Sequence, residues 1–351
     1  MKAVAIHRDG ARAEEIAGRI LCHDVRGNRN EIVFRKGHIV RDDDVPPLLA
    51  CAWSELHLIE LEAGDLGQRE AGERLAVAAS GAGVEIAPSG HKHALRAVHD
   101  GLLEVDLPTL VAMNMLPGIS IFTLLDGQVI SAGQVVAQAQ IAPLALDKRT
   151  VAEAERIAAR GVIRVAPFIP RQAVIFVRER FEAAERDRAL EPLIAKLRWF
   201  GCPIREVADL PHDVPAIRGA LEARLSSEAT LFVIAGSNAL DPLDPIVAAI
   251  GESGATMQRL GMPVHPGTLL WLASLGAIAI IGLPSCGFAA QPTALDLVLP
   301  RILAHGTIRD EEIAALGHGG ILNRGMAFRF PQYDALLNHE TASEVADERL
   351  R

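Results

Sequence analysis

Between Gln172 and His305 the chain alternates short apolar segments with longer amphipathic ones. Segments 173–177 (AVIFV) and 229–236 (ATLFVIAG) are almost entirely apolar, which is typical of strands buried on both faces of a sheet. Segment 182–201 spaces its apolar residues as a helix does and ends at a glycine. This alternation predicts an α/β fold with a doubly wound, mainly parallel sheet.

The longest apolar run, Leu269 to Leu283, belongs to the same region. It is roughly 15 residues long, which is short of the ~20 residues that a membrane-spanning helix needs. Ser274 and Gly276 interrupt it. We therefore expect two strands joined by a tight link at Leu275–Gly276, and no membrane partner.

The composition limits the class of partner. Of 351 residues, 50% are apolar and 23% are charged, so enough apolar surface is available for more than one core and global disorder is excluded. Only 4% are aromatic, and the net charge is −9. Neither a base-stacking surface nor general attraction to a phosphate backbone is expected, so nucleic acid is excluded as a partner. A local anion site needs only backbone N–H groups and a helix dipole, and it remains open.

The cysteines and the N-terminus indicate the compartment. Four widely spaced cysteines without a C-x-x-C pair argue against structural zinc and a disulfide framework. The segment MKAVAIHRDGARAEE lacks the apolar core of a signal peptide. A cytoplasmic protein is expected.

Changes in pattern divide the chain into four parts. Residues 1–83 mix helix and strand signals, and residues 84–170 contain short alternating runs typical of a small β-rich module. The α/β domain spans residues 171–309, and residues 310–351 form a charged tail that contains the glycine-rich segment GHGG. Proline-rich VAPFIPRQ marks the boundary near residue 170.

Two polar clusters lie in the N-terminal half. Asp42–Asp44 precede a segment with prolines in its first turn, where carboxylates favour a helix N-terminus. His91 and His93 form an H-x-H pair that a strand would place on one face, an arrangement that suits a metal ion. No third ligand is in view, so a solvated loop is the favoured interpretation.

The first candidate loop of the α/β domain follows the apolar strand 229–236. In open α/β sheets, ligands bind beyond the carboxyl ends of the strands. Asp241 could hold a cation or a ligand amine, or form a turn, and it is the candidate catalytic residue. Asp244 precedes a proline and suits either a helix cap or a metal. The candidate residues of this loop are Gly236, Ser237, Asn238, Asp241 and Asp244.

The second loop, GMPVHPG, is stiffened by Pro263 and Pro266, while Gly267 allows close approach of the backbone. Such a loop suits ligand clamping, and a plain turn between strands is the alternative. His265 could donate a hydrogen bond to a phosphate or stand exposed.

The third loop closes an apolar strand and precedes a segment with a helical pattern, QPTALDLVLPRILAHG. Small residues that open onto a helix N-terminus form a phosphate cradle. The spacing matches neither the P-loop nor the dinucleotide fingerprint. Cys286 could be a nucleophile, but no partner base is evident. The candidate residues are Gly282, Pro284, Ser285, Cys286 and Gly287.

Taken in order, AGSNALD, GMPVHPG and GLPSCG resemble three loops of the molybdopterin molybdotransferase family, the relatives of the gephyrin E-domain. Residues 12–65 resemble the opening segment of that family, and residues 172–305 resemble its molybdopterin-binding domain. A divergent subgroup, some of whose members are fused to a nucleotidyltransferase, is more similar still, since it has a GMPVDPG loop and a cysteine in the last loop.

The chain also departs from the family pattern. The threonine-glycine-aspartate-glutamate loop of the family's enzymes is absent after strand 173–177, and so is the aspartate-serine-asparagine motif that follows it. Only Gly236 remains of a glycine pair, and we do not expect the family's usual C-terminal β-domain in the residues that follow the last predicted helix. These losses remove carboxylates that would hold metal or molybdate.

The resemblance implies a molybdopterin- or molybdenum-cofactor-binding protein of molybdenum cofactor biosynthesis or handling, with a homodimer as its assembly. One alternative is an active molybdotransferase that inserts molybdate with Mg²⁺. Another is a non-catalytic carrier or sensor that delivers the cofactor to a molybdoenzyme. A nucleotide hydrolase, suggested by a related domain in competence-damage proteins, is more distant because no catalytic dyad is present.

Overall fold

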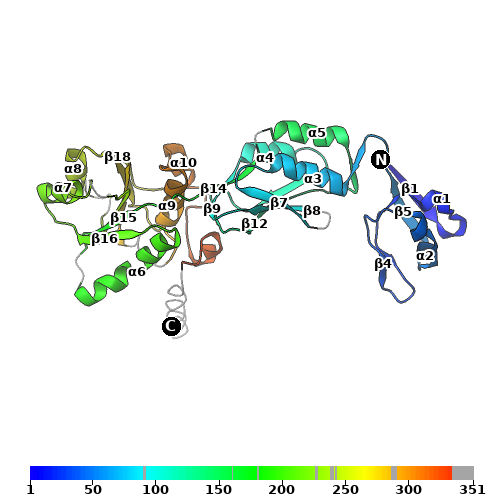
Figure 1. The fold of residues 1–351 in the computed structure, drawn as a ribbon, viewed down its shortest axis with the longest axis horizontal. Coiled ribbons are helices and arrows are strands. Elements are labelled where there is room, and N and C mark those ends of the chain that lie inside the picture. The colour runs from blue at the N-terminus through cyan, green and yellow to red at the C-terminus, as the bar shows by residue number, and fades with distance from the viewer. Residues whose placement is uncertain are drawn as a thin grey trace. The chain divides into compact units, whose positions relative to one another are not determined.

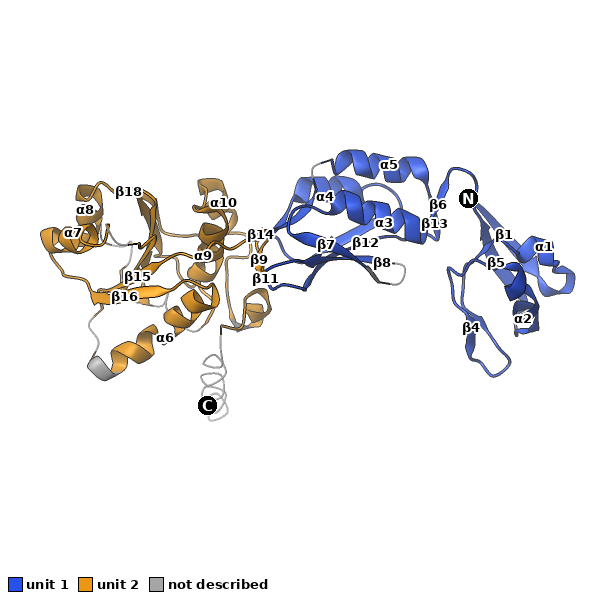
Figure 2. Cartoon of the chain, in the orientation of Figure 1, with its two compact units in different colours: residues 1–99, 103–126, 131–165 blue, residues 100–102, 127–130, 166–351 orange. Residues whose placement is uncertain are grey.

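The computed structural model describes residues 1–89, 92–159, 161–179, 182–225, 228–237, 241, 243–285 and 291–333. The chain forms two compact units (Figure 2). Unit 1 contains residues 1–99, 103–126 and 131–165, and unit 2 contains residues 100–102, 127–130 and 166–351. No helix in the described ranges is long and apolar enough to cross a membrane.

The first part of unit 1 has its own core. Its three-stranded antiparallel sheet has the order β1 (Lys2–His7), β5 (Glu55–Glu60), β2 (Ile20–Leu21), and β3 (Val25–Arg26) pairs with β4 (Ile32–Phe34). The helical elements are η1 (Arg8–Gly10), α1 (Ala13–Ile16), η2 (Asp42–Asp44) and α2 (Val45–Ala50). The expected helix with prolines in its first turn is α2. The Asp44 carboxylate accepts a hydrogen bond from Arg41 N at 2.9 Å, which caps the turn that leads into α2.

The second part of unit 1 is built on a four-stranded antiparallel sheet of order β10 (Ile119–Thr123), β12 (Val135–Ile141), β8 (Lys92–Ala97), β7 (Val84–Ser89). Helices α3 (Gln68–Ala79), α4 (Leu107–Asn114) and α5 (Lys148–Ile157) lie on one side of it (Figure 1). Two smaller sheets complete the strand pairing, namely β11 (Val129–Ile130), β9 (Gly101–Val105), β14 (Ile163–Pro167), and β13 (Ala145–Asp147) with β6 (Asp65–Gly67).

These elements agree with a β-rich region after residue 84 and add helices α4 and α5, which the alternating pattern did not predict. Helix α3 packs on β8 and β12, so it belongs with this sheet rather than with the mixed segment before it. Helix α4 begins where the Asp106 side chain accepts from Thr109 N at 3.2 Å. The apolar residues of α4 do not form the clear stripe by which we predict helices.

Unit 2 contains the predicted mainly parallel sheet. Its order is β16 (Ile204–Asp209), β15 (Ala173–Val177), β17 (Leu231–Ala235), β20 (Ile278–Leu283), β19 (Trp271–Leu275), β18 (Thr256–Leu260). The first four strands are parallel to one another. Strand β19 is antiparallel to both of its neighbours, β20 and β18, so β18 runs in the same direction as the first four strands. The apolar run thus forms the expected pair of strands, β19 and β20, which are linked through Gly276 with φ +58°.

Helices cover both faces of this sheet. Side chains of α6 (Ala183–Trp199) and α9 (Ala294–His305) share a core with one face, and those of α7 (Val214–Glu222) and α8 (Pro245–Glu252) share a core with the other. Strands β15 and β17 are buried along their whole length, as apolar strands between two helical layers must be.

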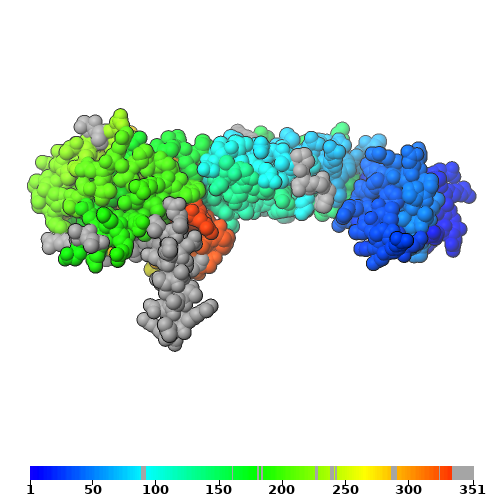
Figure 3. Space-filling view, turned by 60° about the horizontal axis from the view of Figure 1, so that its bottom comes forward, coloured from blue at the N-terminus to red at the C-terminus, as the bar shows by residue number. Residues whose placement is uncertain are grey.

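The described part of the charged tail also belongs to this core. Helix α10 (Asp310–Ala315) and η4 (Arg324–Arg329) follow α9, and four nearby side chains are buried in the α6–α9 core, namely Ile313, Leu316, Leu322 and Tyr333. The orange-red atoms of this segment lie against the rest of unit 2 (Figure 3). Because we expected this segment to form a charged tail, we did not predict that these four side chains would be buried.

Candidate functional site

Three loops leave the sheet of unit 2 at one edge. Ala235 at the end of β17 pairs with Leu283 at the end of β20, so the loops after both strands start side by side. Leu260 at the end of β18 pairs with Trp271 at the start of β19, and Trp271 pairs with Gly282. The loop between β18 and β19 therefore lies at the same edge, beyond the carboxyl ends of the parallel strands, where open α/β sheets bind ligands.

Two hydrogen bonds tie the loops together. Ser237 N donates to Leu283 O at 2.7 Å, which joins the first loop to the third. Ala294 N donates to Pro266 O at 2.9 Å, which joins the second loop to the first residue of α9. The structure thus places the starts of the first and third loops, and both ends of the second loop, at one edge of the sheet.

In the first loop, close packing explains the residue types. Gly236 has φ +81°, and a Cβ there would lie 2.8 Å from Cβ of Glu179, so a larger residue would be both strained and crowded. Ser237 is buried, and its hydroxyl accepts from Trp271 Nε1 at 3.2 Å. Asn238 lies outside the described residues.

The aspartates of this loop have structural partners. Asp241 is exposed, and its carboxylate accepts from Leu243 N at 2.9 Å, as in an Asx-turn. Asp244 caps α8 by accepting from Ile246 N at 2.8 Å. Both Asp244 oxygens also accept from Nη1 of Arg178, at 2.6 and 2.7 Å. An ion pair in which both side chains are largely buried leaves Asp244 little capacity to bind a metal.

The second loop packs tightly against α9. Gly267 has φ +107°, and a Cβ there would lie 2.6 Å from that of Ala294. The His265–Pro266 peptide is cis. The backbone of His265 bonds to the C-terminal segment, donating to Gly320 O at 2.8 Å and accepting from Leu322 N at 2.7 Å. The imidazole itself is exposed, as is Pro263.

In the third loop, Gly282 is required by its neighbour. A Cβ at Gly282 would collide with the indole ring of Trp271. Pro284 is buried and Ser285 is exposed, while Cys286 and Gly287 lie outside the described residues.

The N-terminus of α9 is capped by the protein itself. Ala294 N donates to Pro266 O, Leu295 N to the Thr293 hydroxyl at 3.3 Å, and Asp296 N to Thr293 O at 3.0 Å. These N–H groups are therefore not free for an anion, contrary to the simplest form of the cradle expectation. Residues 286–293 separate the helix from Ser285, so an anion here would rely on backbone groups of the loop.

His93, the described member of the histidine pair, does not lie in the solvated loop that we predicted. His93 is buried within β8 rather than solvated in a loop, and burial lowers the pKa of its imidazole. His91 lies outside the described residues. Within the part of the chain that the structure describes, no cluster of three or more His, Cys, Asp or Glu side chains could hold a metal ion.

Three residues at the loop edge were missed by the sequence analysis, namely Arg178, Glu179 and Trp271. Arg178 and Glu179 directly follow β15, whose last residue pairs with Ala235. Charged residues that follow a fully apolar parallel strand are a usable signal, because such strands end at the ligand edge. Burial of Trp271 beneath Gly282 depends on the β19–β20 pairing and has no comparable local signal.

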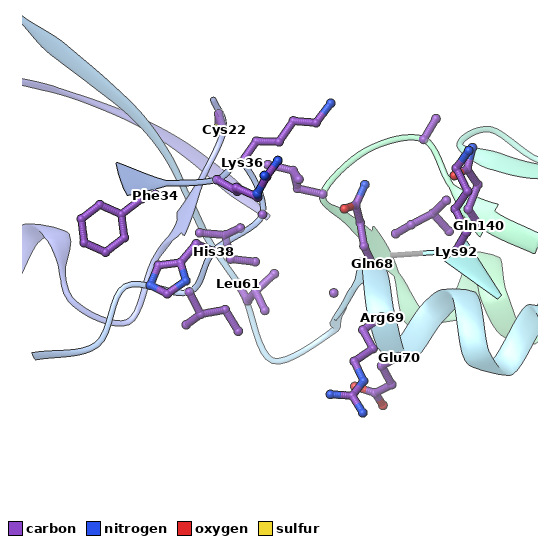
Figure 4. A pocket seen from close by; sticks show the side chains of 18 of the residues that line it. Cys22, Phe34, Lys36, His38, Leu61, Gln68, Arg69, Glu70, Lys92 and Gln140 are labelled. Atoms are coloured by element: carbon purple, nitrogen blue, oxygen red, sulfur yellow. The ribbon is translucent and has the colours of Figure 1, made fainter. Parts of the chain in front are cut away.

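Unit 1 contains a separate hollow of about 1440 Å³. Figure 4 shows Lys36 and His38 on one side of it and Gln68, Arg69 and Glu70 at the start of α3 on the other. None of the candidate residues of the three loops lines it.

Comparisons with known proteins gave three findings. The model of a domain of unknown function (DUF8806) matches residues 11–60. No curated protein matches the chain. The chain is similar to a crystal structure of molybdenum cofactor biosynthesis protein B, at 12% identity and a TM-score of 0.29, over 40% of this chain and 94% of that one. It is also similar to the molybdopterin biosynthesis MoeA protein from Pyrococcus horikosii, at 12% identity and a TM-score of 0.28, over 90% of this chain and 77% of that one.

Proposed function

We propose that the chain binds molybdopterin or the molybdenum cofactor at the loop edge of unit 2 and acts in molybdenum cofactor biosynthesis or handling. The observation that carries this proposal is the convergence of the three loops whose sequences resemble the molybdopterin molybdotransferase family. There the Ser237–Leu283 backbone bond joins the first loop to the third, and the Pro266–Ala294 backbone bond joins the second loop to the first residue of α9. The homodimer and the molybdoenzyme partner remain part of the proposal.

The residues take roles that follow from their chemistry. Backbone N–H groups of the loop Gly282–Gly287, with the Ser285 hydroxyl, hold the phosphate of the pterin. Gly236, Ser237 and Asn238 line the pterin, and Asp241 bonds to an amine or cation. His265 and Gly267 close the site. A small anion held by backbone groups does not require a positive net charge on the protein.

Binding without metal-dependent catalysis is favoured by the residues at the edge. A Mg²⁺ site needs free carboxylate oxygens, and those of Asp244 are engaged by Arg178. Among the residues that the structure describes, no cluster of three or more His, Cys, Asp or Glu side chains could hold a metal ion, so we derive no metal-assisted step. A carrier or sensor is accordingly the favoured form of the proposal, and turnover of adenylylated pterin with molybdate and Mg²⁺ would overturn that preference.

Calorimetry or native mass spectrometry with molybdopterin and its adenylylated form tests binding directly. We expect association at micromolar protein, unaffected by a chelator. Absence of binding to both forms would exclude the proposal.

Ser285→Asp tests the location of the site. A carboxylate beside the bound phosphate should weaken binding at least about tenfold, or ~1.4 kcal/mol, through like-charge repulsion. Ser274→Asp is the matched control, because Ser274 is exposed near the other end of β19 and should leave the affinity unchanged. Equal affinity in Ser285→Asp and the wild type would place the anion elsewhere.

A further inference from the structure

The described C-terminal segment contacts the second loop from within unit 2. Ile321 forms a parallel β-bridge with His265, so the segment bonds to both the N–H and the carbonyl group of His265 along one edge of the second loop. A Cβ at Gly320 would lie 2.5 Å from Pro263 O, which shows how closely the two backbones approach. The segment ends, within the described residues, at Tyr333, whose ring is buried in the α6–α9 core.

Beneath the start of α9 lies a buried ion pair. Lys196 of α6 and Asp296 of α9 are 2.8 Å apart, and their side chains are 2% and 0% exposed. Lys196 Nζ also donates to Gln291 O at 3.1 Å, and Asp296 Oδ2 accepts from Thr293 N at 2.7 Å. Lys196 therefore fixes both the exit of the third loop and the first turn of α9.

Burial of this pair is costly enough to require an explanation. The desolvation free energy of two buried charges is offset only when the ion pair has favourable geometry and both groups make further hydrogen bonds. A lysine in the last turn of an amphipathic helix, as Lys196 is in α6, normally keeps its ammonium group in water. Here the ammonium group is turned inward, onto the segment that follows the proposed anion loop.

Tyr333 closes this cluster. It is the only tyrosine of the chain, and Lys196 Nζ lies 5.5 Å from the centre of its ring. The ring also packs against Trp199 at 6.1 Å between centroids. The Tyr333 hydroxyl and Asp296 Oδ1 are both buried. The hydroxyl interacts with the Asp296 carboxylate, although neither atom makes a hydrogen bond of good geometry within the described residues. Burial, and next the charge of Asp296, raise the pKa of Tyr333 well above its usual value.

We propose that Lys196, Asp296 and Tyr333 form a latch through which the C-terminal segment sets the geometry of the second and third loops. Lys196 and Tyr333 are then positioning residues, which act on the site through the backbone of Gln291 and the start of α9. The Tyr333 hydroxyl interacts with the Asp296 carboxylate, so ordering of the C-terminal segment and ordering of the start of α9 stabilise each other. The latch itself stands on the contacts above, whereas its coupling to ligand rests on the proposed function.

The latch is tested first without ligand. Tyr333→Phe retains the packed ring and removes only the hydroxyl, and Arg198→Gln is the matched control because Arg198 is exposed on the same helix as Lys196. We expect hydrogen exchange of amides 291–297 to become at least about fivefold faster in Tyr333→Phe and to stay unchanged in the control. Unchanged exchange in Tyr333→Phe would overturn the latch whether or not any ligand binds.

The coupling is tested with molybdopterin. Because the chain has one tyrosine, protein labelled with fluorotyrosine gives a single fluorine NMR signal from position 333. We expect that signal to shift on saturation with molybdopterin, and the affinity of Tyr333→Phe to fall about tenfold, the size of one hydrogen bond to a charged group. If wild type binds but the signal and the Tyr333→Phe affinity are unchanged, the coupling is wrong. If wild type fails to bind, the proposed function is wrong and the ligand-free result still stands.

Discussion

At the scale of single residues, hydrogen-bond and ion-pair partners determine which side chains at the loop edge of unit 2 are free to bind a ligand. Asp244 was predicted to act as a helix cap or to bind a metal, and the structure confirms the cap and adds Arg178 as a partner of both oxygens. Lys196 looks like a solvated residue in the sequence but is buried against Asp296. In both cases the partner residue is distant in the sequence, so the sequence around Asp244 or Lys196 could not predict the ion pair.

Burial of the His93 imidazole leads us to expect that the free energy of unfolding depends on pH. Its pKa is lowered by burial, with a further lowering from Arg69 and an opposing contribution from Glu73. Between the unfolded pKa of about 6.5 and the lower folded value, the unfolded chain binds the proton and the folded chain does not. Stability due to this residue is therefore full above pH 6.5 and falls as the pH drops through that window.

Thermal unfolding at pH 7.5 and 5.5 checks this expectation. His93→Leu should show a smaller loss of stability on acidification than wild type, whereas His318→Gln, at an exposed position, should behave as wild type does. An equal loss in His93→Leu and wild type would show that other groups account for the acid sensitivity.

Helices and strands were predictable where the pattern was strong and local. The strand pair within the apolar run and the buried strands β15 and β17 follow from their apolar periodicity and length. Helix α4 could not be predicted from apolar periodicity, because the apolar residues Leu107 and Val111 lie on its exposed face. Helix α9 was expected, but the use of its first N–H groups by Pro266 and Thr293 follows from how the second loop packs.

Thr293 caps α9, and its removal should weaken the helix that supports two site loops. Thr293→Ala is expected to lower the free energy of unfolding of unit 2 by about 1 kcal/mol, within a range of roughly 0.5–2. Thr293→Ser keeps the hydroxyl that Leu295 N bonds to and should restore most of the loss. Chemical denaturation measures both, and equal stability of the alanine and serine variants would argue against the cap.

At the scale of the whole molecule, the chain contains separate hydrophobic cores rather than one. Residues of β1, β5, α1 and α2 form a core of their own in the first part of unit 1, and two further cores cover the faces of the sheet in unit 2. The two cores of unit 2 share one sheet and should unfold together, whereas the core of the first part of unit 1 should unfold in a separate transition, since cooperativity depends on shared packing.

Leu56→Ala tests this separation. Leu56 is fully buried in the first core, and its truncation should lower the stability of that part by about 2–5 kcal/mol. In calorimetry we expect one transition to move while the transition of the unit 2 sheet stays in place. Val233→Ala, in a core of unit 2, should produce the reverse pattern. A common shift of all transitions in either variant would show a single cooperative structure.

The sequence by itself determined the α/β class, the strand pair in the apolar run and the order of the three candidate loops, because these depend on local periodicity and on turn residues. Only the tertiary structure decided that the loops meet at one edge, that Arg178 neutralises Asp244, and that Tyr333 closes a buried cluster beneath α9. Each of these depends on strand order and on contacts between distant segments. Such contacts form only when the chain has folded, so no local pattern could contain them.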